Sequence, residues 1–140
     1  MRFLLLIPCL FFFTLSYGKT IRVGPGEATR SLKKAIDMSR DGDSILLLGG
    51  IYKEGSLVIS KSIVITGLHN PVVDGEYKYE IFFIKGRNIT IRGLELRNSG
   101  YSAIDDFASV KLADCHNVII ESNIFRNSYF AIHVSNSQGT

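Results

Sequence analysis

Few residues in this 140-residue sequence could bind a metal ion. Beyond residue 18 they are one thiol, three imidazoles and one thioether: Cys115, His69, His116, His133 and Met38. Copper(I) prefers ligands of these types. Cys115 and His116 adjoin, so two such ligands come together there and nowhere else in this part of the sequence. The candidate metal ligands are therefore Cys115, His116 and His133.

Each candidate ligand also has a simple structural interpretation. Adjacent side chains on an extended turn diverge, so Cys115 and His116 could chelate one ion only with a third group from elsewhere in the fold. Cys115 could instead be a small buried turn residue, and His116 a solvated one. His133 alternates with apolar neighbours, so it should point outward beside Lys111. Both interpretations remain open at this point.

Acidic side chains offer a second chemistry, because clustered carboxylates can bind calcium and, with a nearby base, help to remove a proton from a sugar. The candidate acids are Asp74, Glu76, Asp105, Asp106 and Asp114, and the candidate bases are Lys78, Arg92, Arg97 and Lys111. No two of these acids recur at the 22-residue spacing found below. The sequence therefore does not predict an assembled calcium cluster, and no catalytic residue is assigned.

These residues lie in a sequence that repeats itself. Residues 88–98 read NITIRGLELRN and residues 117–127 read NVIIESNIFRN, at an offset of 29. Laid over each other, the copies place Leu94 on Ile124, and their flanking asparagines coincide. Apolar residues alternate with polar ones in each copy, as in short strands. Strands this short must bury their apolar face against a neighbouring copy.

The next strand reveals a shorter period. Val110 and Ile132 are separated by 22 residues, so the offset of 29 is interpreted as 22 plus an insertion within residues 99–109. Three short strands in a turn of about 22 residues predict an all-β fold, a parallel β-helix, in which each strand pairs with its equivalents in the coils above and below.

The repeat assigns positions to the apolar and asparagine side chains. The residues expected to point inward are Ile89, Ile91, Leu94, Leu96, Val110, Leu112, Val118, Ile120, Ile124, Ile132 and Val134. Those expected to fill wider corners are Phe82, Phe83, Phe125 and Phe130. Asn98, Asn127 and Asn136 should form hydrogen-bonded stacks in the turns.

Residues 1–18 have the pattern of a cleaved secretory signal peptide: a positive end, an apolar run and small residues before Lys19. Residues 19–140 then form one domain, in which Cys115 has no cysteine to pair with. The formal charge of the whole chain, +3, is small and scattered, which argues against nucleic-acid binding. Ser31 should cap a short helix that ends at residues 40–42 and covers the first coil.

Two segments carry a resemblance to known families. Residues 20–55 resemble the N-terminal cap and first coil of right-handed parallel β-helix proteins, a superfamily that includes pectate lyases. Residues 72–137 are similar to the NosD-like family of periplasmic copper-processing proteins, which mature nitrous oxide reductase. The segments that carry this second resemblance are RNSG at 97–100, DDFA at 105–108 and FAI at 130–132.

The NosD-like resemblance implies a periplasmic, non-enzymatic accessory protein that assists copper delivery to nitrous oxide reductase together with an ABC transporter. Copper would be bound transiently, and no cofactor would be required for folding. The alternatives are a carbohydrate-binding or carbohydrate-cleaving β-helix, with polysaccharide lyase as the enzymatic form, and a purely structural surface module. NosD-like proteins have many more coils, so we expect this chain to be the N-terminal portion of a longer protein, or another subunit to cover its last coil.

Overall fold

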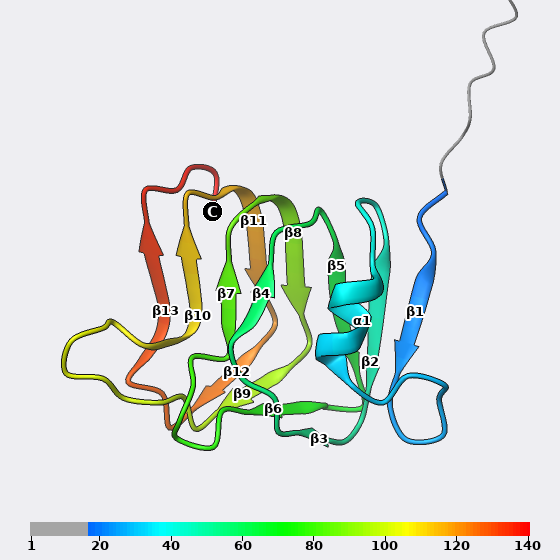
Figure 1. The fold of residues 1–140 in the computed structure, drawn as a ribbon, viewed down its shortest axis with the longest axis horizontal. Helices are drawn as coiled ribbons and strands as arrows, with labels where there is room; N and C mark the ends of the chain where they lie inside the picture. The colour runs from blue at the N-terminus through cyan, green and yellow to red at the C-terminus, as the bar shows by residue number, and fades with distance from the viewer. Residues whose placement is uncertain (1–16) are drawn as a thin grey trace, which may run out of the picture.

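The structure, a computed structural model, describes residues 17–140 and is a parallel β-helix with one short helix near the beginning of the described chain (Figure 1). The predicted fold is thereby confirmed. All of the predicted signal peptide except Tyr17 and Gly18 lies outside the described residues. Within residues 17–140, no helix has the length and apolar character needed to cross a membrane.

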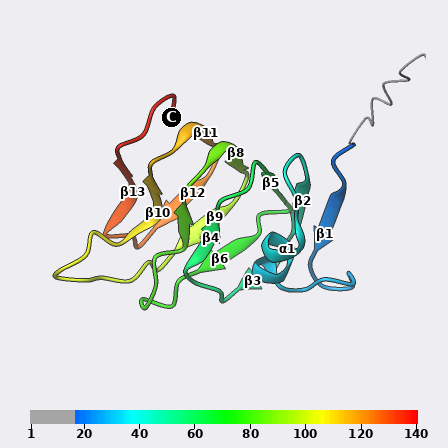
Figure 2. The same cartoon turned by 45° about the horizontal axis from the view of Figure 1, so that its top comes forward.

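Three parallel sheets run along the axis of the β-helix, and from β2 onward successive strands of the chain pass from one sheet to the next (Figures 1 and 2). Sheet A has the order β1 (Thr20–Val23), β2 (Ser44–Leu48), β5 (Val64–Leu68), β8 (Arg87–Arg92) and β11 (His116–Glu121). Sheet B has the order β3 (Ile51–Tyr52), β6 (Val72–Asp74), β9 (Glu95–Arg97) and β12 (Ile124–Arg126). Sheet C has the order β4 (Leu57–Ile59), β7 (Phe82–Ile84), β10 (Ala108–Ala113) and β13 (Phe130–Ser135).

The strand register confirms most of the repeat and corrects one position. Val110 pairs with Ile132, as the 22-residue spacing predicts. Ile124, however, pairs with Glu95 and is 47% exposed, so its predicted inward position opposite Leu94 is wrong. The Leu94 N–H instead donates to the Asn123 side-chain oxygen at 3.0 Å. The backbone register across this turn stays at 29 residues. This register determines which residues pair, although Leu94 and Ile124 have similar apolar side chains.

Asparagines fix the corners between strands. Asn88 and Asn98 have φ of 54°, and Asn117 and Asn127 have φ of 55° and 51°, in the left-handed region that asparagine tolerates better than most residues. The Asn117 amide donates to the Asn88 side chain at 2.8 Å, and the Asn127 amide donates to the Asn98 side chain at 3.0 Å. The predicted stack of Asn98 and Asn127 is therefore confirmed, and Asn88 and Asn117 form a second stack that was not predicted.

Asn136 does not extend the predicted stack of Asn98 and Asn127. Its amide donates to the Asp114 carboxylate at 2.6 Å, across a different corner. Asp114 has φ of 55° and Asn136 has φ of 44°, so an aspartate takes the left-handed position there. The register of 22 residues between β10 and β13 brings these two residues together.

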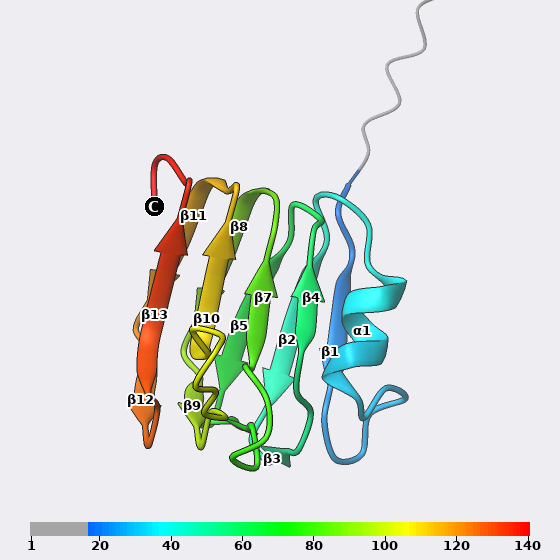
Figure 3. The ribbon, with the colours of Figure 1, turned by 60° about the vertical axis from the view of Figure 1, so that its left-hand side comes forward.

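The helix α1 (Leu32–Met38) lies at the end of the stack of coils (Figure 3). Ser31 caps it as predicted, because its side-chain oxygen accepts a hydrogen bond from the Lys34 N–H. The helix ends at Met38, before the predicted stop at residues 40–42. There the Lys61 ammonium group donates to two of the last carbonyl groups, each at 2.8 Å.

The core is a continuous stack of apolar side chains inside the three sheets. Its predicted members Ile89, Ile91, Leu94, Leu96, Val110, Leu112 and Val118 are buried. Phe82 also points inward within β7, so it does not fill a corner as predicted. Phe83 alternates with it and faces outward, where the Lys85 ammonium lies 5.7 Å from its ring centroid. Ile132 and Val134 lie on the last described coil and are 41% and 46% exposed.

A pair of substitutions on neighbouring strands tests the register. Ile91→Asp would place an unpaired charge in the core, where Ile91 is fully buried, and should lower the free energy of unfolding by more than about 4 kcal/mol. Ile119→Asp is the control, because Ile119 is 47% exposed on β11. Circular dichroism and urea unfolding should show an unfolded first variant and a folded second one. A normally folded Ile91→Asp protein would contradict the register.

Candidate functional site

Cys115 lies in the corner between β10 and β11, and its side chain points into the core. The residue is 4% exposed, and its thiol donates to the Ile84 carbonyl oxygen at 3.1 Å. Its backbone N–H donates to the Ser137 hydroxyl, as the 22-residue spacing predicts for the following coil. In this conformation the sulfur faces protein atoms and is closed to a metal ion in solution.

The two candidate histidines point away from this thiol. His116 begins β11 and is exposed, while its backbone N–H donates to the Gly86 carbonyl. His133 lies in β13 on the outer face of sheet C, where it pairs with Lys111 as predicted. Its Nε2 lies 3.9 Å from the Asp106 carboxylate, and its buried Nδ1 has no hydrogen-bond partner in the described part of the chain.

The structure thus separates Cys115 from the two imidazoles. Within residues 17–140, no three histidine, cysteine or acidic side chains lie close enough together to bind a metal ion. Copper binding by Cys115, His116 or His133 remains a prediction. In the conformation seen here it would require movement of the chain around Cys115.

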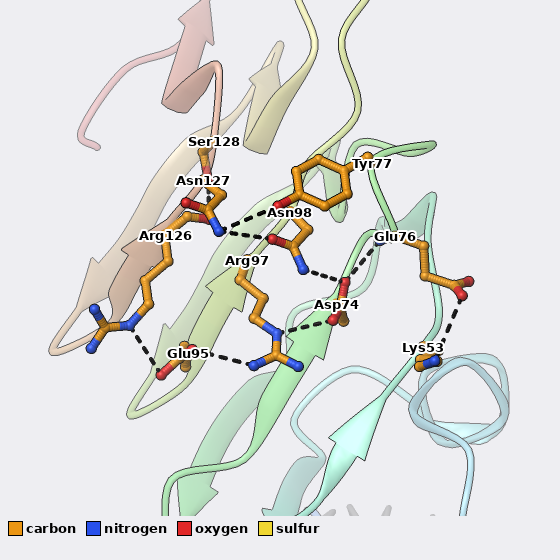
Figure 4. A network of polar contacts seen from close by, with 10 residues as sticks. All are labelled: Lys53, Asp74, Glu76, Tyr77, Glu95, Arg97, Asn98, Arg126, Asn127 and Ser128. Atoms are coloured by element: carbon orange, nitrogen blue, oxygen red, sulfur yellow. Dashed lines mark hydrogen bonds and ion pairs between the residues drawn. The ribbon is translucent and has the colours of Figure 1, made fainter.

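A network of polar contacts joins the corners that follow β6, β9 and β12 (Figure 4). Asp74 lies at its centre and is 6% exposed. The Arg97 Nε donates to one of its carboxylate oxygens at 2.9 Å, and the Asn98 amide and the Glu76 N–H donate to the other. Arg126 lies on the next coil, with its Nε 3.4 Å from the Glu95 carboxylate.

The contacts of Asp74 determine its charge state. Burial acts to raise the pKa of this carboxyl, but hydrogen bonds from the Glu76 N–H, the Asn98 amide and the Arg97 guanidinium outweigh burial and lower the pKa below its usual value. Asp74 is therefore a carboxylate at neutral pH with its lone pairs already engaged. It clamps one turn to the next and is poorly placed to take up calcium.

A second group of charged residues lies on the outer face of sheet C, beside the loop of residues 99–107. Glu80 precedes β7, and burial raises its pKa; the Lys111 ammonium acts to lower this pKa, and the negative charge of Asp105 adds a smaller increase. Asp106 and His133 adjoin this group. Sequence reasoning identified Asp105, Asp106, Lys111 and His133 but missed Glu80. That residue lies outside the repeat, so no spacing signalled its position.

Comparisons of the chain with protein-family models, curated proteins and solved structures found no match. The comparisons therefore assign the chain to no family.

The burial of Cys115 predicts slow thiol chemistry. In the folded protein, a disulfide reagent such as Ellman's reagent should modify Cys115 on the order of 100-fold more slowly than in the urea-unfolded protein, because reaction requires local opening of the coil. Stopped-flow absorbance would measure both rates. Equal rates would show that the thiol is open to solvent, as in a preformed metal site.

The clamp at Asp74 predicts a pH-dependent contribution to stability. Asp74→Asn should lower the free energy of unfolding by about 2 kcal/mol at pH 7, because it weakens the charged hydrogen bonds from Arg97 and Asn98. Since the folded-state pKa is lowered, this contribution is present above the unfolded-state pKa of about 4 and is lost as the pH falls through the folded-state value.

Urea unfolding of both proteins between pH 2 and pH 7 would measure this effect. The difference between wild type and Asp74→Asn should shrink toward the acid end. Asp37→Asn is the control, because Asp37 is exposed in α1 beside Lys33 and should change stability by about 0.5 kcal/mol or less. A difference for Asp74→Asn that stays constant with pH would contradict a charged clamp.

Proposed function

We propose that this protein is a NosD-like periplasmic accessory factor that assists delivery of copper to nitrous oxide reductase together with an ABC transporter. In this proposal the β-helix is a non-enzymatic scaffold and copper is its cargo. The resemblance of residues 72–137 suggests the role, and the observed parallel β-helix is the fold that this resemblance implies.

The proposal is carried by the way the fold assembles the segments most similar to NosD-like proteins. The segments 97–100 and 105–108 are close in sequence, and the segment 130–132, further along the chain, adjoins them in space. The last two begin the paired strands β10 and β13. Tyr101, which follows the first segment, packs against Tyr129, which precedes the third, with ring centroids 5.0 Å apart. The three segments thus lie together at one side of the fold, which supports the proposal.

Copper as cargo sets a requirement on Cys115. A thiolate is the form that binds copper(I), so the thiol would have to lose its proton and its hydrogen bond to Ile84. The same local opening that admits a thiol reagent would admit copper. The free energy of this opening would slow copper binding and lower its apparent affinity, as transient handling requires.

Copper loading in cells tests the proposal. In a host that makes both proteins, deletion of this gene should leave the amount of nitrous oxide reductase polypeptide unchanged while its copper content falls several-fold. Metal analysis of the purified reductase measures the effect, and expression of the wild-type protein should restore the copper. Full copper content in the deletion strain would refute the proposed function.

A copper(I) competition titration addresses the ligand separately. We expect the purified protein to bind copper(I) and Cys115→Ser to bind it at least about 10-fold more weakly, since a hydroxyl is a poor ligand for this ion. Met38→Leu is the control, because the Met38 thioether lies in α1 at the other end of the fold. Equal affinities for wild type and Cys115→Ser would remove Cys115 from the candidate ligands.

A further inference from the structure

An exposed surface of aromatic and acidic side chains lies where the loop of residues 99–107 leaves the stack of coils. We call it the aromatic–acidic patch and define it by Glu80, Tyr101, Asp105, Asp106, Tyr129 and Phe130. The loop connects β9 to β10 and projects beyond the strands, in yellow at the left of Figure 1. Figure 3 shows it in front of β10, on the outside of the coils.

The aromatic part of the patch is a chain of three rings. Tyr101 and Tyr129 meet edge to face at 5.0 Å, and Tyr129 and Phe130 meet edge to face at 4.6 Å. Their exposures are 66%, 59% and 39%. Edge-to-face packing holds the rings in place while leaving ring surface open. Exposed tyrosine and phenylalanine gathered in this way are typical of protein interfaces.

The acidic part of the patch lacks balancing charge within its own loop. Residues 99–107 contribute Asp105 and Asp106 and no basic side chain. The Asp105 charge is close enough to Glu80 to help raise the pKa of that carboxyl. On the sheet beneath, the Lys111 ammonium lowers the pKa of Glu80 by more than Asp105 raises it, and His133 lies 3.9 Å from Asp106. A cation from outside would relieve the repulsion between the adjacent Asp105 and Asp106 carboxylates.

We propose that the aromatic–acidic patch is a docking surface for a flexible segment of a partner protein that presents lysine or arginine side chains. Ring faces attract such cations, and carboxylates form charge-assisted hydrogen bonds with them. The same carboxylates would repel nucleic acids and anionic membranes. A neutral sugar would bring no counter-charge to the adjacent Asp105 and Asp106 carboxylates. This inference does not depend on the role in copper delivery.

Nuclear magnetic resonance titration of the ¹⁵N-labelled protein with short blocked peptides provides the test. The probe is Gly-Arg-Gly-Arg-Gly, and the matched peptide Gly-Gln-Gly-Gln-Gly controls for shape. The arginine peptide should shift the amide signals of residues 99–107 and 128–133, with binding weakened at high salt, and the glutamine peptide should shift them far less. This comparison uses the wild-type protein, so it does not depend on the folding of any variant.

Two double variants locate the binding. Asp105→Asn with Asp106→Asn, and Tyr101→Ala with Tyr129→Ala, should each weaken binding of the arginine peptide by about 5-fold or more. Asp37→Asn with Ile51→Ala is the control, because it removes one exposed carboxylate and one exposed apolar side chain elsewhere on the surface. It should leave the affinity unchanged.

Three outcomes would overturn the docking proposal. The glutamine peptide could bind as well as the arginine peptide, or the shifts could fall outside the patch. The third is that a neutral oligosaccharide shifts the patch signals while the arginine peptide does not, which would identify a sugar surface instead. None of these outcomes bears on copper loading of the reductase, so failure here is distinguishable from failure of the proposed function.

Discussion

Each strand of this protein makes its ladder hydrogen bonds with strands of neighbouring coils. A single coil therefore cannot satisfy its own backbone, and it cannot bury its own apolar side chains. Both needs are met only by stacking equivalent strands in a fixed register, with Ile65 on Ile91 and Ile91 on Ile120 along sheet A. The register is thus the constraint on which the rest of the fold depends.

The register limits where the chain can change its length. Coils differ by several residues, as the separations of 22, 26 and 29 between hydrogen-bonded equivalents show. The extra residues of the longer coils lie in the corners between strands, because an extra residue within a strand would turn its apolar face outward. The corners in turn need residues that accept left-handed backbone, which asparagine supplies at Asn98 and Asn127. Differences in the number of residues per coil, and the surface side chains that these differences add, are therefore confined to the turns.

The sequence was sufficient to predict the strands that repeat in register. It was insufficient in the corners, where the repeat is interrupted. Alternating apolar residues around Ile91 and Ile120 identified the coils and the buried face. Ile124 was misplaced because residue type was matched in preference to a constant offset. Glu80 was missed because its surroundings depend on where two inserted turns lie. The residue spacing does not encode the positions of those turns. Asn136 was assigned to the wrong stack because two corners carry similar residues.

The same geometry separates structural from functional groups. A side chain inside the coils, such as that of Cys115, is enclosed by the residues above and below it, so its chemistry depends on opening the stack. An inserted turn begins and ends at strands that the register aligns. Its side chains, such as those of Asp106 and Tyr101, are exposed and can contact a partner. The same register therefore encloses the Cys115 thiol within the coils and leaves Tyr101 and Asp106 exposed in the inserted turn.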